Sequence, residues 1–156
     1  MELTGTRTIA APREVVWAKL NDAETLQACI PGCEELTGSP EEGFQATVKQ
    51  KVGPVKATFK GEVTLSDVNP PESYRIAGEG KGGVAGFAKG GADVKLAEVP
   101  EGTELSYAVD AKVGGKIAQL GSRLIDSFAA KMADAFFENF KERVEGTEVS
   151  PQDPVT

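Results

Sequence analysis

The chain has 156 residues, enough for one globular domain, and its content of 40% hydrophobic and 26% charged residues is ordinary for a folded protein. With 17 basic against 24 acidic residues its formal charge is −7, which disfavours nucleic acid as a partner because nucleic acid is itself a polyanion. The chain has no histidine, which excludes Ser-His-Asp and Cys-His catalysis, histidine-ligated metals and a histidine pH switch.

The beginning of the chain predicts one strand followed by two short helices. Residues 2–9 are rich in threonine and favour a strand. Pro12 suits the first turn of a helix, and the polar pair Asn21-Asp22 separates that helix from a second one. Pro31-Gly32 then ends the second helix.

Between about residues 33 and 113 apolar and polar residues alternate, which predicts antiparallel strands with one buried face and one solvated face. Turn sequences lie at Gly53-Pro54, at residues 69–72 and at residues 100–102, so the strands should form a meander. After Gly114-Gly115 the apolar spacing changes to three and four, which predicts one long helix up to about Val144. We expect one domain over residues 1–144 and a flexible tail over residues 145–156.

This order of elements predicts an α+β fold in which a curved antiparallel sheet of about seven strands surrounds a long C-terminal helix. Small residues of the sheet would face large residues of the helix, which favours an apolar cavity between them; a solid core is the alternative. The candidate cavity residues are Leu26, Ile30, Phe59, Tyr74, Phe87, Tyr107, Leu120, Leu124, Phe128 and Met132.

The segment 78–91 is half glycine and contains the pattern G-x-G-x-x-G at Gly78, Gly80 and Gly83. No helix is expected directly after it, so a nucleotide site is not predicted. Glycines here either allow the sheet to bend towards the helix or leave room for a ligand, and both interpretations stay open.

Four lysines, Lys49, Lys51, Lys56 and Lys60, lie within a stretch that contains no acidic residue. If Gly53-Pro54 is a two-residue turn, Lys51 and Lys56 become directly opposed neighbours. The lysines form either a solvated sheet face or a docking patch for an acidic partner or phospholipid headgroups.

Groups that could perform catalysis are scarce. Tyr74 and Tyr107 are expected to point inward, where a tyrosine with a hydrogen-bonded hydroxyl is the common case. Cys29 and Cys33 provide too few ligands for a zinc site, and we expect two buried thiols, with a reversible disulfide as the alternative. No catalytic residue, metal site or cofactor is predicted.

Several segments spread over most of the chain carry a resemblance to a known family. They are Ala11–Trp17, Leu20–Asp22, Ile30–Glu34, Val52–Val55, Phe59–Gly61, residues 78–91, Gly114–Gly121 and Phe136-Phe137. Together they resemble the CoxG family of carbon monoxide dehydrogenase subunits, which belongs to the START-like (SRPBCC) helix-grip superfamily. The resemblance implies a helix-grip fold, in agreement with the element order.

The resemblance further implies a non-catalytic accessory protein of a molybdenum carbon monoxide dehydrogenase or related hydroxylase. Such a protein would bind a lipid or quinone between sheet and helix and assist membrane recruitment or electron delivery. The alternatives are a small-molecule enzyme of cyclase or hydrolase type on the same fold, or a scaffold without a cavity.

The expected location is the cytoplasm, with peripheral contact at the inner face of the membrane. No apolar run approaches the ~20 residues that cross a bilayer, and Met1–Thr4 do not resemble a signal peptide. Longer family members carry a C-terminal extension that helps membrane attachment, whereas this sequence stops at Thr156. We therefore expect transient contact through the four lysines.

Overall fold

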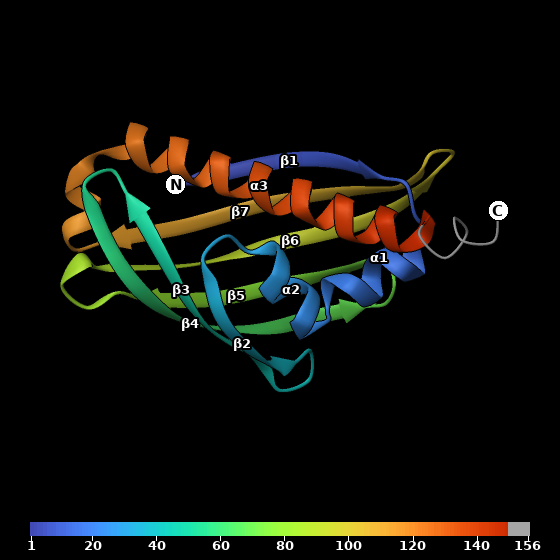
Figure 1. Ribbon diagram of the computed structural model, residues 1–156, viewed down its shortest axis with the longest axis horizontal. Coiled ribbons are helices and arrows are strands. Elements are labelled where there is room, and N and C mark those ends of the chain that lie inside the picture. Colours follow the sequence, from blue (N-terminus) through green and yellow to red (C-terminus); the bar gives the residue numbers. More distant parts are fainter. Residues whose placement is uncertain (150–156) are drawn as a thin grey trace.

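The computed structural model describes residues 1–149 as a curved sheet with a long helix across its concave face (Figure 1). The strands are β1 (Glu2–Ile9), β2 (Cys33–Ser39), β3 (Gly43–Val52), β4 (Val55–Asn69), β5 (Ser73–Lys81), β6 (Phe87–Val99) and β7 (Gly102–Gly114). The helices are α1 (Arg13–Leu20), α2 (Ala23–Cys29) and α3 (Ser122–Val149), with short 3-10 turns η1 (Gly83–Ala85) and η2 (Lys116–Leu120).

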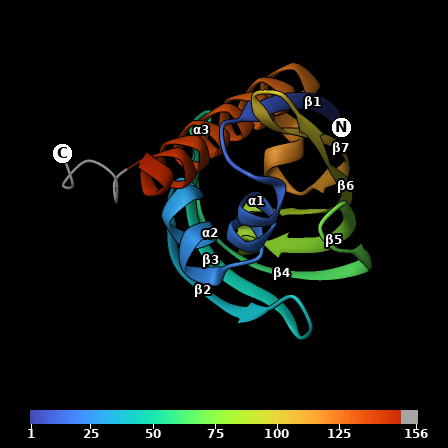
Figure 2. The same ribbon diagram turned by 90° about the vertical axis from the view of Figure 1, so that its right-hand side faces the viewer.

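The sheet is antiparallel throughout, with the strand order β1-β7-β6-β5-β4-β3-β2. Strands β2 to β7 follow one another as hairpins, and β1 joins the far side of β7. Figure 2 shows the sheet curling around the space that the three helices partly fill. The predicted α+β fold, with its seven strands, long C-terminal helix and two short helices after the first strand, is confirmed.

The two short helices end and begin where the sequence predicts. Pro12 precedes α1, and Asp22 lies between the two helices as the N-cap of α2. The Asp22 carboxylate accepts hydrogen bonds from the backbone N–H of Thr25 at 3.1 Å and from its hydroxyl at 2.7 Å. This cap supplies partners to groups that a helix start leaves unpaired.

The predicted bounds of the long helix are wrong at both ends. The helix does not follow Gly114-Gly115 directly, because η2 comes between, and α3 begins only after Gly121, whose φ of +93° a helix cannot accommodate. At its other end α3 continues to Val149, beyond the expected start of the tail at residue 145. The rest of the predicted tail, residues 150–156, lies outside the described residues.

Two apolar clusters lie between the sheet and α3. The larger one surrounds Ile9, Val16 and Phe140, all 0% exposed, where α1, the sheet and the second half of α3 meet. The smaller one, around Val52, Ala85 and Ile117, fills the other end, where η1 and η2 lie. No helix within residues 1–149 is both long enough and apolar enough to span a bilayer.

Candidate functional site

A cavity of about 430 Å³ lies between the concave face of the sheet and the helices. Alternate residues of the strands form one wall, for example Val63 and Leu65 of β4 and Ala92 and Val94 of β6. Because a strand turns every second side chain to the same face, each strand contributes apolar groups to this wall while its polar residues stay outside. The small side chain of Ala92 leaves free space there.

Five of the ten candidate cavity residues line this cavity. They are Leu26 and Ile30 at the end of α2, Tyr74 of β5, Tyr107 of β7 and Met132 of α3. Their convergence from four elements follows from the inward side of each strand and from the apolar stripe of α3. Whether these residues contact a ligand stays a prediction.

The other five candidates lie away from the cavity. Phe59, Leu120 and Phe128 pack against the smaller apolar cluster near η1 and η2. Phe87 and Leu124 are 41% and 37% exposed. The apolar stripe of the C-terminal segment is longer than the cavity, so its first part, including η2, covers the small cluster instead.

Sequence reasoning missed a larger part of the wall. Phe136 and Phe137 belong to the predicted helix stripe but were not assigned to the cavity, which they line together with Ala133. Leu3 of β1 and Val109 of β7 also line it, and the two are directly opposed in the sheet. The inward alternation of β7 is visible in the sequence, whereas the pairing of β1 with β7 is not.

Tyr107 is fixed by polar contacts with β1 and α3. Its hydroxyl accepts a hydrogen bond from Arg7 Nη2 at 3.1 Å, and the same Nη2 lies 2.7 Å from Asp134 Oδ1. The Tyr107 ring stacks on Phe137, with ring centroids 5.1 Å apart. A Cβ at Gly5 would collide with the Tyr107 hydroxyl, so glycine at this position makes room for it. These contacts join β1, β7 and α3 beside the cavity.

Tyr74 lies in a different environment. It is 6% exposed, and its ring and that of Trp17 pack in a T-shaped arrangement with centroids 5.1 Å apart. Within residues 1–149 its hydroxyl has no hydrogen-bond partner. Burial raises the pKa of Tyr74 above its ordinary value, so the hydroxyl keeps its proton at neutral pH.

Three of the four candidate docking lysines, Lys49, Lys51 and Lys56, line one depression of β3 and β4, and whether the four lysines dock a partner stays a prediction. Lys51 and Lys56 are directly opposed beside the Gly53-Pro54 turn, as the sequence predicts. Lys49 instead lies 3.2 Å from Glu34. Lys60 pairs with Thr47 on one side and with Lys81 on the other.

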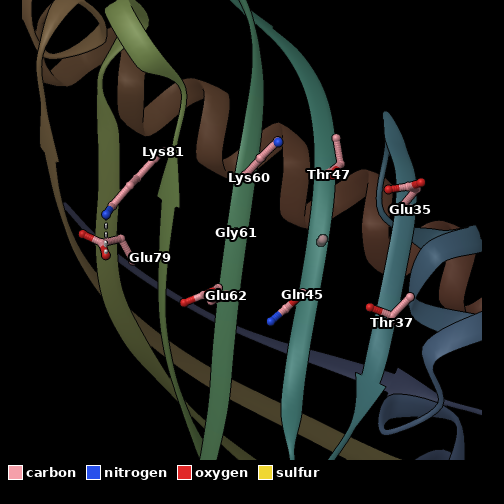
Figure 3. Close-up of a pocket in the computed structure, with 10 residues that line it drawn as sticks. Glu35, Thr37, Gln45, Thr47, Lys60, Gly61, Glu62, Glu79 and Lys81 are labelled. Carbon is pink, nitrogen blue, oxygen red and sulfur yellow. Dashed lines mark ion pairs between the residues drawn. The ribbon is translucent and has the colours of Figure 1, made fainter.

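The outer face around Lys60 is a shallow groove with charges of both signs (Figure 3). It runs across β2 to β5, and Glu35, Glu62 and Glu79 lie in it beside the lysines. Lys81 Nζ is 3.9 Å from Glu79 Oε1. The outer groove is therefore polar and mixed in charge, unlike the cavity on the inner face.

The glycine-rich segment 78–91 does not line the cavity, so the interpretation that its missing side chains leave room for a ligand is wrong for this cavity. A Cβ at Gly78 would collide with Val63, 2.5 Å from its Cγ1. A Cβ at Gly82 would lie 2.5 Å from the ring of Phe59. These glycines let neighbouring side chains pack closely onto the sheet.

Comparison with protein families identifies the chain. Residues 5–145 match the family of the carbon monoxide dehydrogenase subunit CoxG. The chain belongs to the CoxG family. Membership in this family indicates an accessory role associated with carbon monoxide dehydrogenase. None of the curated proteins compared with the chain matches it.

Solved structures share the fold of this CoxG family member. A conserved protein from Geobacillus kaustophilus is 28% identical with a TM-score of 0.87, and the match covers 94% of this chain and 97% of that one. A protein from Rhizobium leguminosarum is 18% identical with a TM-score of 0.72, over 93% and 94% of the two chains. A protein from Thermus thermophilus is 18% identical with a TM-score of 0.69, over 94% and 99%. The fold is therefore helix-grip-like, as the resemblance implied.

The two cysteines of this CoxG family member are free thiols in different surroundings. Cys29 is buried, as expected, whereas Cys33 is only half-buried and its Sγ donates to the carbonyl oxygen of Glu35 at 3.3 Å. Burial raises the pKa of both thiols. Within the described part of the chain, no cluster of His, Cys, Asp and Glu residues could hold a metal ion.

Proposed function

We propose that the protein is a non-catalytic accessory protein of a molybdenum carbon monoxide dehydrogenase or related hydroxylase, and that it carries a lipid or quinone in the cavity between sheet and α3. The cavity is the observation that supports this function. Its volume of about 430 Å³ falls within the range typical of small-molecule sites, and aliphatic and aromatic side chains form most of its wall. An apolar molecule would gain free energy by leaving water for such a space.

The composition of the cavity wall counts against the enzyme alternative. Its polar side chains, within residues 1–149, are Asn21, Tyr74 and Tyr107. General acid–base catalysis needs ionisable groups that converge on one substrate atom, and no carboxylate or lysine lines this space in the described residues. The cavity itself counts against the scaffold alternative, which requires a solid core.

Ligand carriage is tested by mass spectrometry and by titration. Protein extracted gently from its host should carry a lipid or quinone in native mass spectra. Ligand-free protein should also take up an added quinone, followed through the fluorescence of Trp17, the one tryptophan of the chain, which contacts the cavity residue Tyr74. Protein that is always empty and takes up neither quinone nor lipid would refute the carrier function.

A pair of matched variants assigns the uptake to the cavity. Ala92→Leu adds a larger side chain to the cavity wall and should weaken uptake about tenfold or more. Ala97→Leu makes the same chemical change at an exposed position of the same strand and should leave uptake unchanged. Equal effects of the two variants would place the ligand elsewhere.

Recruitment to a membrane would use the basic end of the sheet, which we define as Lys51, Lys56, Lys60, Lys81, Lys89 and Lys112. These exposed lysines form three directly opposed cross-strand pairs, on β3–β4, β4–β5 and β6–β7. Glu79 lies 3.9 Å from Lys81 and is directly opposed to Lys89, so it offsets part of the repulsion there, whereas the repulsion between Lys51 and Lys56 is one that an anionic lipid surface would relieve.

Exposed apolar side chains accompany the basic end of the sheet. Val84 in η1 is 92% exposed, and Phe87 at the start of β6 is 41% exposed. In Figure 1, the turn before β6 and the β3–β4 turn lie at the same end of the molecule. Apolar tips flanked by lysines suit the boundary between lipid headgroups and acyl chains. We therefore assign an anionic membrane surface to this end.

Vesicle flotation tests this assignment. Vesicles containing anionic phosphatidylglycerol should bind the protein, and vesicles of phosphatidylcholine alone should not. The double variant Lys51→Glu/Lys56→Glu should lose most of this binding. Lys19→Glu/Lys95→Glu changes the charge equally on α1 and the far half of β6 and should retain it. Equal loss in both double variants, or no binding by the unmodified protein, would refute the assignment.

A further inference from the structure

The two tyrosines of the cavity wall differ in one respect. The Tyr107 hydroxyl accepts a hydrogen bond from Arg7, whereas the Tyr74 hydroxyl has no partner among the described residues. Tyr74 is only 6% exposed and lies on the inward side of β5. The Tyr74 hydroxyl oxygen is not completely buried, so a molecule from outside the chain can reach it and supply the missing hydrogen-bond partner.

The other polar side chain of the wall is already engaged. Asn21 donates its Nδ2 hydrogen to the carbonyl oxygen of Trp17 at 2.9 Å. Arg7 donates to the Tyr107 oxygen and leaves the Tyr107 O–H proton available, so both tyrosines carry an O–H donor, but only the Tyr74 hydroxyl is held by no other group of the described residues. Because its hydroxyl remains protonated at neutral pH, it can donate a hydrogen bond to a ligand.

We propose that Tyr74 determines the class of ligand: its hydroxyl donates a hydrogen bond to the carbonyl oxygen of an otherwise apolar, uncharged molecule. This inference rests on the proposed carrier function and adds the chemistry of the ligand. Hydrocarbons without an acceptor leave the Tyr74 hydroxyl unpaired and bind less well.

An ionised acid is excluded from this class. A buried carboxylate needs a cation, and the cation beside the cavity, Arg7, is already paired with Asp134 at 2.7 Å. A neutral carbonyl needs only the single donor that Tyr74 supplies. Quinone ketones and lipid esters share this chemistry.

The test compares two probes of the same shape, benzophenone and diphenylmethane, which differ by a carbonyl group in place of a methylene. Each displaces a fluorescent apolar probe, N-phenyl-1-naphthylamine, from the unmodified protein and from two variants. Tyr74→Phe should weaken the binding of benzophenone about tenfold and that of diphenylmethane less than twofold. Comparing the same two probes across variants cancels their different solubilities in water.

Tyr107→Phe is the matched control, because it removes a second O–H donor of the cavity wall, one whose oxygen Arg7 holds beside Asp134. This variant should change the affinities of both probes by the same factor. The proposal is overturned if Tyr74→Phe changes both probes equally, or if Tyr107→Phe weakens benzophenone selectively by as much as Tyr74→Phe does. Circular dichroism establishes that both variants are folded.

The outcomes separate this inference from the proposed function. Displacement by both probes with no selective effect of Tyr74→Phe would overturn the inference and leave the carrier function standing. No binding of any apolar probe to the unmodified protein would overturn both. Repeating the titrations with 2-methyl-1,4-naphthoquinone and methyl decanoate separates ring ketones from acyl esters. The class that the cavity prefers is the one whose binding Tyr74→Phe weakens about tenfold. If Tyr74→Phe weakens the binding of neither compound, the inference is also overturned.

Discussion

Lys51 and Lys56 are directly opposed across the β3–β4 hairpin, two residues of like charge on the same face of one antiparallel pair. Such a pair destabilises a hairpin, since the ammonium groups are held near each other without an intervening acid. The hairpin retains it next to a turn that also brings Gly53 against Leu124 of α3, with 2.9 Å between a Cβ at Gly53 and Leu124 Cδ2. The repulsion therefore lies on an exposed end of the sheet whose inner side is packed.

The opposed lysines predict that stability and membrane binding change in opposite directions. Lys51→Glu replaces repulsion by attraction to Lys56 and should raise the Tm by roughly 1–3 °C. The same change should weaken flotation with phosphatidylglycerol vesicles several-fold. Differential scanning calorimetry and flotation measure the two effects. A lower Tm with unchanged flotation would contradict both expectations, and Lys51→Gln should give intermediate values.

The cap of α2 predicts a pH-dependent contribution to stability. Hydrogen bonds from the Thr25 side chain and backbone lower the pKa of Asp22, so the folded state favours the ionised carboxylate. This stabilisation is present above the ordinary pKa of 3.8 and is lost as the pH falls through the lowered pKa of the folded state. Asp22→Ala should cost about 1 kcal/mol of unfolding free energy at pH 7.

Urea unfolding at pH 7 and at pH 3 checks the role of Asp22. Asp22→Asn is the matched control, because its side-chain oxygen still caps the helix but does not titrate. The advantage of the unmodified protein over Asp22→Asn should shrink towards zero as the pH falls. An advantage that stays constant from pH 7 to pH 3 would show that ionisation of Asp22 does not stabilise α2.

The overall fold could be predicted because its signals are local. Alternation in β4 and β7 identifies the inward residues, and Asn21-Asp22 and Pro31-Gly32 mark the ends of α1 and α2. The start of α3 could not be predicted, because the apolar spacing continues unbroken through η2. The left-handed φ of Gly121, which the spacing does not reveal, separates η2 from α3.

The cavity could be predicted only in part, for a different reason. Which strand residues face inward follows from alternation, but how far along the sheet the space is filled depends on contacts between distant segments. The packing of Phe59 and Phe128 into the small cluster is such a contact, as is the pairing of Leu3 with Val109. The free hydroxyl of Tyr74 has no sequence signal, because Tyr74 and Tyr107 share the same inward pattern.

Replacement of Arg7 should cause a large loss of stability. Its guanidinium bonds to Tyr107, pairs with Asp134 and lies 5.1 Å from the ring centroid of Phe137, so it joins β1 to β7 and α3. Arg7→Met should lower the free energy of unfolding by about 1–3 kcal/mol. Urea denaturation measures the change.

Arg75→Met is the control for Arg7. Arg75 pairs with Asp93 at 3.0 Å on the outer face of the sheet, where water screens the interaction. Its replacement should have a clearly smaller effect than that of Arg7. An equal or larger effect would mean that the contacts of Arg7 do not hold β1 to α3.

The two thiols predict a difference in reactivity. Cys29 is 1% exposed, whereas Cys33 is half-buried, so a reagent reaches Cys33 in the folded protein but reaches Cys29 only when the structure opens. N-ethylmaleimide at about pH 7.5 should modify Cys33 at least about tenfold faster than Cys29. Because burial raises the pKa of Cys33, its rate should still increase between about pH 7.5 and pH 9. In intact-mass spectra, Cys33→Ser should remove the fast modification by N-ethylmaleimide. Equal rates at both cysteines, or a disulfide between them in the purified protein, would refute this assignment.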